Sequence, residues 1–134
     1  MATRGEGNQR LRPMTERCEH GIPAAVDGHF YAGIGENFSG ADLNRANLTG
    51  ANLTEANLFS ATLHGANLPG ANLTRARLFD ADLSGVEMSR ANLIGADLSG
   101  ADLTRADLAY ADLTDAHLTR AHRMVKHVSP STGP

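Results

Sequence analysis

A five-residue unit repeats without interruption through most of this chain. Residues 36–120, 85 residues or seventeen units, read ENFSG ADLNR ANLTG ANLTE ANLFS ATLHG ANLPG ANLTR ARLFD ADLSG VEMSR ANLIG ADLSG ADLTR ADLAY ADLTD AHLTR. We call the central residue of each unit position i; it is Phe38 in the first unit and Leu in every later unit except at Met88. Position i−2 is Ala after the first unit, except at Val86. One register held through seventeen units constrains the fold more than any other feature.

A period of five fits neither an α-helix nor a flat β-strand. Steps of five residues on an α-helix advance by about 140°, which would scatter the leucines around the axis. On a strand, an odd period sends successive leucines to opposite faces. We therefore expect each unit to be a short extended piece followed by a corner, so that every central side chain points inward.

The other positions agree with a chain that turns at every unit. Position i−2 shares the inner side with position i because strand side chains alternate, and position i−1 then faces outward. Position i−1 is polar throughout the leucine units, and position i+2 is often Gly, Arg, Asp or Glu. Gly, Asn, Asp and Ser are accepted in tight turns. The expected structural core consists of Leu43, Leu48, Leu53, Leu58, Leu63, Leu68, Leu73, Leu78, Leu83, Met88, Leu93, Leu98, Leu103, Leu108, Leu113 and Leu118.

The A(D/N)Lxx pattern closely resembles the pentapeptide-repeat proteins over about 85 of the 134 residues. The resemblance implies an all-β fold, a right-handed quadrilateral parallel β-helix, with four units per coil and one on each face. Seventeen units then form a solenoid of about four coils, roughly 20 Å long at a spacing of about 4.8 Å. We expect residues 1–21 to be a flexible N-terminal segment, 22–35 an N-terminal cap, 36–120 the β-helix, and 121–134 a C-terminal cap and tail.

Composition restricts the class of function. The formal net charge of −3 gives no general basic surface for nucleic acid. A single cysteine, Cys18, excludes an internal disulfide framework and fits a reducing compartment. The first residues lack the apolar core of a secretory signal, and no stretch approaches the roughly 20 apolar residues of a membrane span. We therefore expect a cytoplasmic protein that binds neither nucleic acid nor membranes directly.

The sequence offers no pattern typical of catalysis or metal binding. No Gly-rich loop precedes a helix, and the outward Asp and His residues have no pocket that would exclude water or shift a pKa. Two groups lack a recognised zinc spacing: Cys18, His20 and His29, and His117, His122 and His127. We expect a non-enzymatic protein with no catalytic residue, no metal site and no cofactor.

With a coil of twenty residues, side chains twenty positions apart stack on neighbouring coils. Phe59 and Phe79 are then neighbours on one face, where they form either a contact patch for a partner or a local ladder that stabilises the sheet. Glu55 and Arg75 are expected to form a surface ion pair. Tyr110 is expected to stand alone.

Acidic residues gather near the C-terminal end of the repeats. Position i−1 becomes Asp97, Asp102, Asp107 and Asp112 in four successive units, and Asp115 follows. In the expected helix, the first four place one carboxylate on each face. These carboxylates either hydrogen-bond nearby turns or form an electrostatic surface for a basic partner.

The expected function is that of a protein-binding scaffold or regulatory interaction module, with Asp97 to Asp115 and the two phenylalanines as candidate contacts. The resemblance supplies an alternative, because some bacterial members mimic duplex DNA, bind DNA gyrase and protect it from quinolones or other poisons. Matching B-DNA over about 20 Å would need roughly twelve negative charges. The repeats hold eleven Asp and Glu against six Arg. The gyrase-binding members dimerise through their C-terminal ends, which makes such a homodimer an alternative here, although this tail is much shorter.

Overall fold

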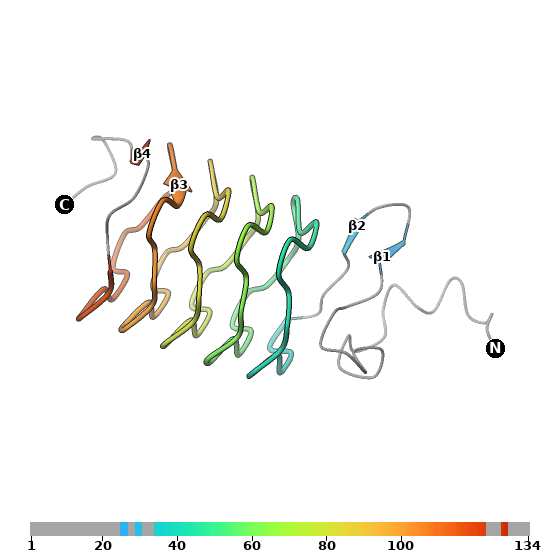
Figure 1. Ribbon diagram of the computed structural model, residues 1–134, viewed down its shortest axis with the longest axis horizontal. Helices are drawn as coiled ribbons and strands as arrows, with labels where there is room; N and C mark the ends of the chain where they lie inside the picture. Colours follow the sequence, from blue (N-terminus) through green and yellow to red (C-terminus); the bar gives the residue numbers. More distant parts are fainter. Residues whose placement is uncertain (1–24, 27–28, 31–33, 123–126, 129–134) are drawn as a thin grey trace.

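The protein is a rod of stacked loops, and each strand in its described part is two residues long. The computed structural model describes residues 25–26, 29–30, 34–122 and 127–128. Strands β1 (Ala25–Val26) and β2 (His29–Phe30) pair antiparallel, and strands β3 (Asp107–Leu108) and β4 (His127–Val128) pair parallel. Figure 1 shows the β1–β2 hairpin at the N-terminal end of the rod and β4 beside β3 at the other end.

Between these elements the repeats are joined by parallel bridges between residues twenty positions apart. The bridges run from Asn37–Asn57 to Asp102–His122, and the β3–β4 pair continues the same register. We call each twenty-residue step a coil; it contains four units. Each face of a coil contributes a single bridge, because the chain turns after every short extended piece. Residues twenty apart therefore lie side by side along the described rod, as expected from the sequence.

The interior is filled by the residues at positions i−2 and i. The central side chains from Leu43 to Met88 are almost fully buried, as are most of the alanines between them. Val86 and Met88, where the pattern changes, are both fully buried, so the larger residue at i−2 is accommodated beside the unbranched thioether. Leu113 and Leu118 differ from the expected full burial and are only partly buried. They belong to the last described coil, where no further described unit stacks on them.

Backbone hydrogen bonds account for four of the five amide groups in a typical unit. The amides at i−1, i and i+2 donate to carbonyls on neighbouring coils, and the amide at i−2 donates to the carbonyl of the preceding central residue across the turn. The unit 71–75 shows the pattern: Ala71 donates to Leu68, Asn72 to Ala51, Leu73 to Asn92 and Arg75 to Ile94. Only the amide at i+1 lacks a backbone acceptor in this scheme. A buried or half-buried amide without a partner is costly.

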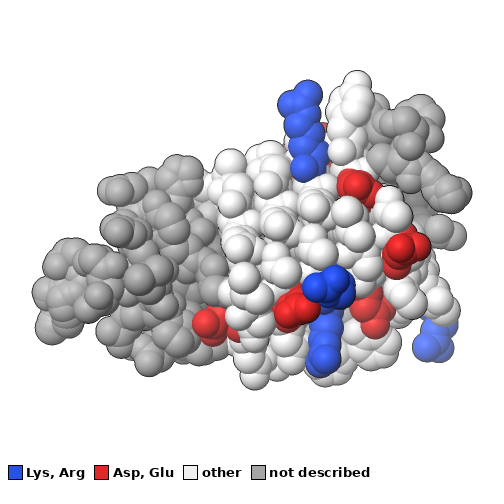
Figure 2. All heavy atoms as spheres, turned by 180° about the vertical axis from the view of Figure 1, so that it is seen from behind, with Lys and Arg blue, Asp and Glu red and all other residues white. Residues whose placement is uncertain are grey.

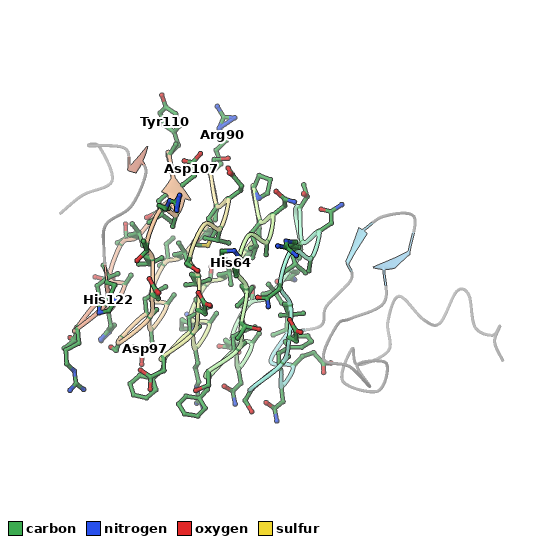
Figure 3. All side chains as sticks on the ribbon, in the orientation of Figure 1. His64, Arg90, Asp97, Asp107, Tyr110 and His122 are labelled. Carbon is green, nitrogen blue, oxygen red and sulfur yellow. The ribbon has the colours of Figure 1, made fainter. Side chains whose placement is uncertain are left out.

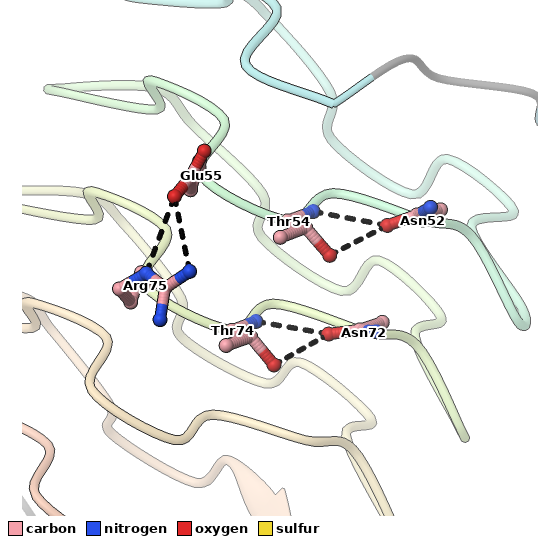
Figure 4. Close-up of polar contacts among 6 residues, drawn as sticks. All are labelled: Asn52, Thr54, Glu55, Asn72, Thr74 and Arg75. Carbon is pink, nitrogen blue, oxygen red and sulfur yellow. Dashed lines mark hydrogen bonds and ion pairs between the residues drawn. The ribbon is translucent and has the colours of Figure 1, made fainter.

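The side chain at i−1 supplies the missing acceptor. The Thr74 amide donates to Asn72 Oδ1 at 3.0 Å, and the Thr74 hydroxyl donates to the same oxygen at 2.7 Å (Figure 4). The same amide contact recurs in twelve units, with Asn or Asp as the acceptor. Where Thr62 stands at i−1, Asn44 of the preceding coil accepts from the His64 amide instead, at 2.8 Å. Asn and Asp at i−1 are therefore turn caps.

The turn requires a left-handed backbone at position i+2. All eighteen residues at this position from Gly35 to Arg120 have positive φ, and ten of them are not glycine. Positive φ at the second central residue only, with a hydrogen bond closing the turn, is the pattern of a type II turn. Pro69 and Gly70 occupy the two central positions of one such turn, where both residue types are favoured.

Two asparagines at equivalent positions provide a test of the turn cap. Asn72→Ala removes the acceptor of the Thr74 amide and should lower the free energy of unfolding by about 1 kcal/mol. Asn67→Ala should have a much smaller effect, because residue 69 is proline and has no amide hydrogen to cap. Denaturant unfolding of both variants measures the difference. Equal losses of stability would contradict the role assigned to position i−1.

Candidate functional site

One side of the rod carries exposed aromatic side chains. We call it the phenylalanine face; it consists of residues 36–40, 56–60, 76–80, 96–100 and 116–120, which stack through parallel bridges. Phe59 and Phe79 both occupy position i+1, with ring centroids 5.6 Å apart and ring planes inclined by 14°. Their exposed fractions are 44% and 37%. The structure therefore brings the two phenylalanines together as expected, and leaves a large part of each ring open to solvent.

Charged groups border this aromatic pair. At the corner preceding the face, Arg75 Nε and Nη2 both lie 3.2 Å from Glu55 Oε2 (Figure 4), as expected for a surface ion pair. Arg77 and Asp97 stack on the face itself, one coil apart. An open pocket of about 720 Å³ lies across these groups. It is lined by Ser39, Asn57, Phe59, Arg75, Ala76, Arg77, Phe79, Gly95 and Asp97.

The four successive aspartates do not gather into one site. Asp97, Asp102, Asp107 and Asp112 bridge to four different columns, so each lies on a different side of the rod. Figure 3 shows Asp97 and Asp107 on opposite edges. Each of the four accepts a hydrogen bond from the amide at i+1 and caps its turn. Asp115 differs, since it occupies position i+2 with a φ of 60° and is exposed.

Turn capping also changes the acidity of these groups. The Thr104 hydroxyl and amide lower the pKa of Asp102, with a smaller contribution from His122. The Ser99 hydroxyl is the main cause of the lowered pKa of Asp97, and the Thr114 hydroxyl that of Asp112. These carboxylates therefore remain ionised while they serve the turns.

The surface charges form no continuous acidic strip on the side shown in Figure 2. Acidic and basic side chains are scattered over a mostly uncharged surface, and most of the acidic ones lie nearer the C-terminal end. Asp42, Asp82 and Asp102 fall in one column, but Thr62 and His122 stand in the same column. The carboxylates in this column are therefore interrupted by an uncharged residue and followed by a histidine, so they do not form a continuous acidic surface.

Tyr110 does not stand alone, contrary to the sequence expectation. The guanidinium of Arg90, twenty residues earlier, lies 5.6 Å from the centroid of the Tyr110 ring. Figure 3 shows both side chains projecting from the same corner of the rod. The twenty-residue spacing that places Phe79 beside Phe59 also places Tyr110 beside Arg90, so this cation–π contact has a signal in the sequence.

The histidines near the C-terminus lie on separate sides. His117, His122 and His127 follow Asp97, Asp102 and Asp107 by one coil, on three different columns. The described residues contain no group of three or more potential metal ligands. Cys18 and His20, from the other group considered for zinc, lie outside the described residues, as do the side chains of His29 and His127. Nor does the described part of the chain hold a helix long and apolar enough to cross a membrane.

Comparison with known proteins gives a consistent family match. A family model described as pentapeptide repeats (8 copies) matches residues 37–75, 56–93 and 87–122. No curated protein sequence matches the chain significantly.

Solved structures show the same likeness. HetL, a pentapeptide repeat protein involved in heterocyst differentiation regulation from the cyanobacterium Nostoc sp. strain PCC 7120, is 34% identical with a TM-score of 0.60, over 72% of this chain and 52% of HetL. Rfr23, from the cyanobacterium Cyanothece 51142, is 37% identical with a TM-score of 0.48, over 63% of each chain. QnrB1, a plasmid-mediated fluoroquinolone resistance protein, is 20% identical with a TM-score of 0.30, over 69% of this chain and 59% of QnrB1. The chain spans about half the length of HetL and less than two thirds of the other two.

The lowered pKa values predict an acid-sensitive C-terminal coil. A carboxylate whose folded pKa lies below its unfolded value, about 4, stabilises the fold above that value and loses this effect as the pH falls through the folded pKa. Thermal stability should therefore fall below about pH 4. The variant Asp97→Asn/Asp102→Asn/Asp112→Asn keeps an oxygen acceptor at each cap. Its midpoint should fall less between about pH 7 and pH 3 in circular-dichroism melts. An undiminished fall would contradict this.

Proposed function

The chain belongs to the pentapeptide-repeat family, and on that premise we propose that it is a non-enzymatic protein-binding module with a regulatory role, whose docking surface is the phenylalanine face. The observation that carries the proposal is the pair of exposed, stacked rings of Phe59 and Phe79. Large apolar side chains gathered on an otherwise polar surface are typical of interaction sites. The likeness to HetL, named for its involvement in the regulation of differentiation, supports the regulatory part of the proposal.

The composition of the aromatic column favours a role in binding over a role in folding. The same column holds Ser39 before the two phenylalanines and Ser99 after them. The turn forms equally well in these units, with both serine amides capped by the residue at i−1. Phenylalanine is therefore not needed to build position i+1. A partner provides a reason for two exposed rings at the centre of one face.

We also propose that the coils have the right-handed quadrilateral form that the family resemblance implies. We further propose that the protein is cytoplasmic, because a single cysteine is typical of a reducing compartment.

Protection of DNA gyrase by DNA mimicry is the weaker alternative. A DNA mimic needs carboxylates repeated along one surface, whereas Asp97, Asp102, Asp107 and Asp112 lie on four sides. The eleven acidic residues of the repeats are opposed by six arginines, which leaves a net charge of −5 against the roughly twelve negative charges of a comparable length of duplex. The likeness to QnrB1 concerns the fold alone.

The docking surface can be tested by replacing both rings with the residue found elsewhere in their column. Phe59→Ser/Phe79→Ser should keep the fold and abolish retention of a partner protein in affinity capture from source cells. Ile94→Ser is the matched control, because it removes a large apolar side chain at position i+1 of another face. It should retain the partner. If the double variant captures the same protein as the wild type, the phenylalanine face is not the docking surface.

The gyrase alternative predicts a different result in a supercoiling assay. On our proposal, micromolar protein at low salt neither inhibits gyrase nor rescues it from a fluoroquinolone. Inhibition or rescue that weakens with added salt, and that is lost in Asp97→Asn/Asp102→Asn/Asp112→Asn, would favour DNA mimicry instead.

A further inference from the structure

Two columns at the phenylalanine face have a symmetric order of residue types. Position i+1 runs small, aromatic, aromatic, small along four successive coils. At the neighbouring corner, position i+2 of the preceding units, the side chains are in turn neutral, acidic, basic and neutral. In coil order, the first four members of the two columns are Ser39, Phe59, Phe79 and Ser99, and Gly35, Glu55, Arg75 and Gly95; a fifth coil adds Thr119 and Asp115, which lie beyond this symmetric part. Both orders are centred at the same height on the rod, between its second and third coils.

A two-fold axis at that height makes the face complementary to itself. If two copies meet face to face with antiparallel rods, Phe59 of one lies opposite Phe79 of the other, and Glu55 lies opposite Arg75. Each contact then occurs twice, as in any isologous interface. With parallel rods, the two-fold axis would run along the rods, so Glu55 and Arg75 would oppose Ser60 and Asp80 at the other corner of the face, and the phenylalanines of the two copies would not meet. Contact between the aromatic side chains therefore selects the antiparallel arrangement.

The remaining charges on the face also tolerate the antiparallel arrangement. Arg77 falls opposite Asn57 of the second copy, and Asp97 falls opposite Asn37. No like charges meet at position i−1. The same operation on the side that carries Asp42 and Asp102 would place these two carboxylates against each other.

The Glu55–Arg75 ion pair can form further hydrogen bonds and ion pairs with a second molecule. Arg75 directs two of its five N–H donors to one oxygen, Glu55 Oε2. The two side chains keep exposed fractions of 65% and 49%. In an antiparallel pair of rods, two such ion pairs form one network of four charges, around a cluster of four phenylalanine rings.

We propose that the phenylalanine face binds the same face of a second copy of this chain in an antiparallel homodimer. This inference rests on the proposed function and names the partner of that surface. The face measures roughly 20 Å by 10 Å, which is smaller than a standard interface. The dimer is therefore weak, with a dissociation constant of about 100 μM or more, and it leaves the other sides of both rods open.

A charge exchange between two samples tests the pairing directly. Glu55→Arg gives a chain with two arginines at the corner, and Arg75→Glu gives a chain with two glutamates. Both positions have a left-handed backbone that already accepts either residue type. Each variant alone should dimerise about ten-fold more weakly than the wild type, because like charges meet at both corners. An equimolar mixture should recover dimerisation, because every arginine then meets a glutamate.

Sedimentation velocity up to about 1 mM protein measures the dimer, with one variant fluorescently labelled to identify the mixed species. Circular dichroism verifies that both variants fold. Arg105→Glu is the matched control, since it changes the net charge as Arg75→Glu does but lies at another corner; it should dimerise like the wild type.

Three results would overturn the proposal. The first is a wild-type protein that stays monomeric up to about 1 mM, and the second is a mixture of the two variants that does not recover dimerisation. The third is a dimer that neither charge exchange weakens, as expected for a dimer through the C-terminal ends. The proposed function is tested separately. If the wild type is monomeric but Phe59→Ser/Phe79→Ser still loses a captured partner, only the self-pairing is wrong.

Discussion

The structure depends on one tight turn between each central residue and the alanine that follows two residues later. That turn leaves a single amide in each unit, at position i+1, without a backbone acceptor. Asn or Asp at i−1 accepts from it in most units, and the residue at i+2 takes a left-handed backbone. Because the chain turns identically each time, every central side chain points into the rod and every fourth unit returns to the same face.

The repeated turn gives each position of the unit its own role. Ala and Leu side chains fill the interior. The Asn and Asp side chains at position i−1 lie on the surface, but they accept hydrogen bonds from the turn amides. The carboxylate of Asp102, for example, accepts from both the amide and the hydroxyl of Thr104. Side chains that neither fill the interior nor cap a turn, such as those of Phe59 and Phe79, are the ones free to serve a partner. The phenylalanine face is therefore a better candidate for binding than the acidic residues of the last coil.

The sequence predicts most of this arrangement because its period is strict. The interior, the Phe59–Phe79 stack and the Glu55–Arg75 pair all follow from counting in fives and twenties. The uniform left-handed backbone at i+2 was harder to predict, since residues as different as Arg75 and Tyr110 occupy it and non-glycine residues seldom adopt positive φ. The partial exposure of Leu113 and Leu118 depends on what stacks beyond the last repeats, which no pattern within a unit can specify.

Both the interior and the phenylalanine face depend on residues twenty positions apart being neighbours. Nuclear Overhauser contacts in solution measure this proximity. We predict contacts between the rings of Phe59 and Phe79 and between Tyr110 and Arg90, together with backbone contacts between each residue and its counterpart twenty positions later from Asn37 to His122. Contacts at any other regular separation, or their absence between the two phenylalanine rings, would contradict the account.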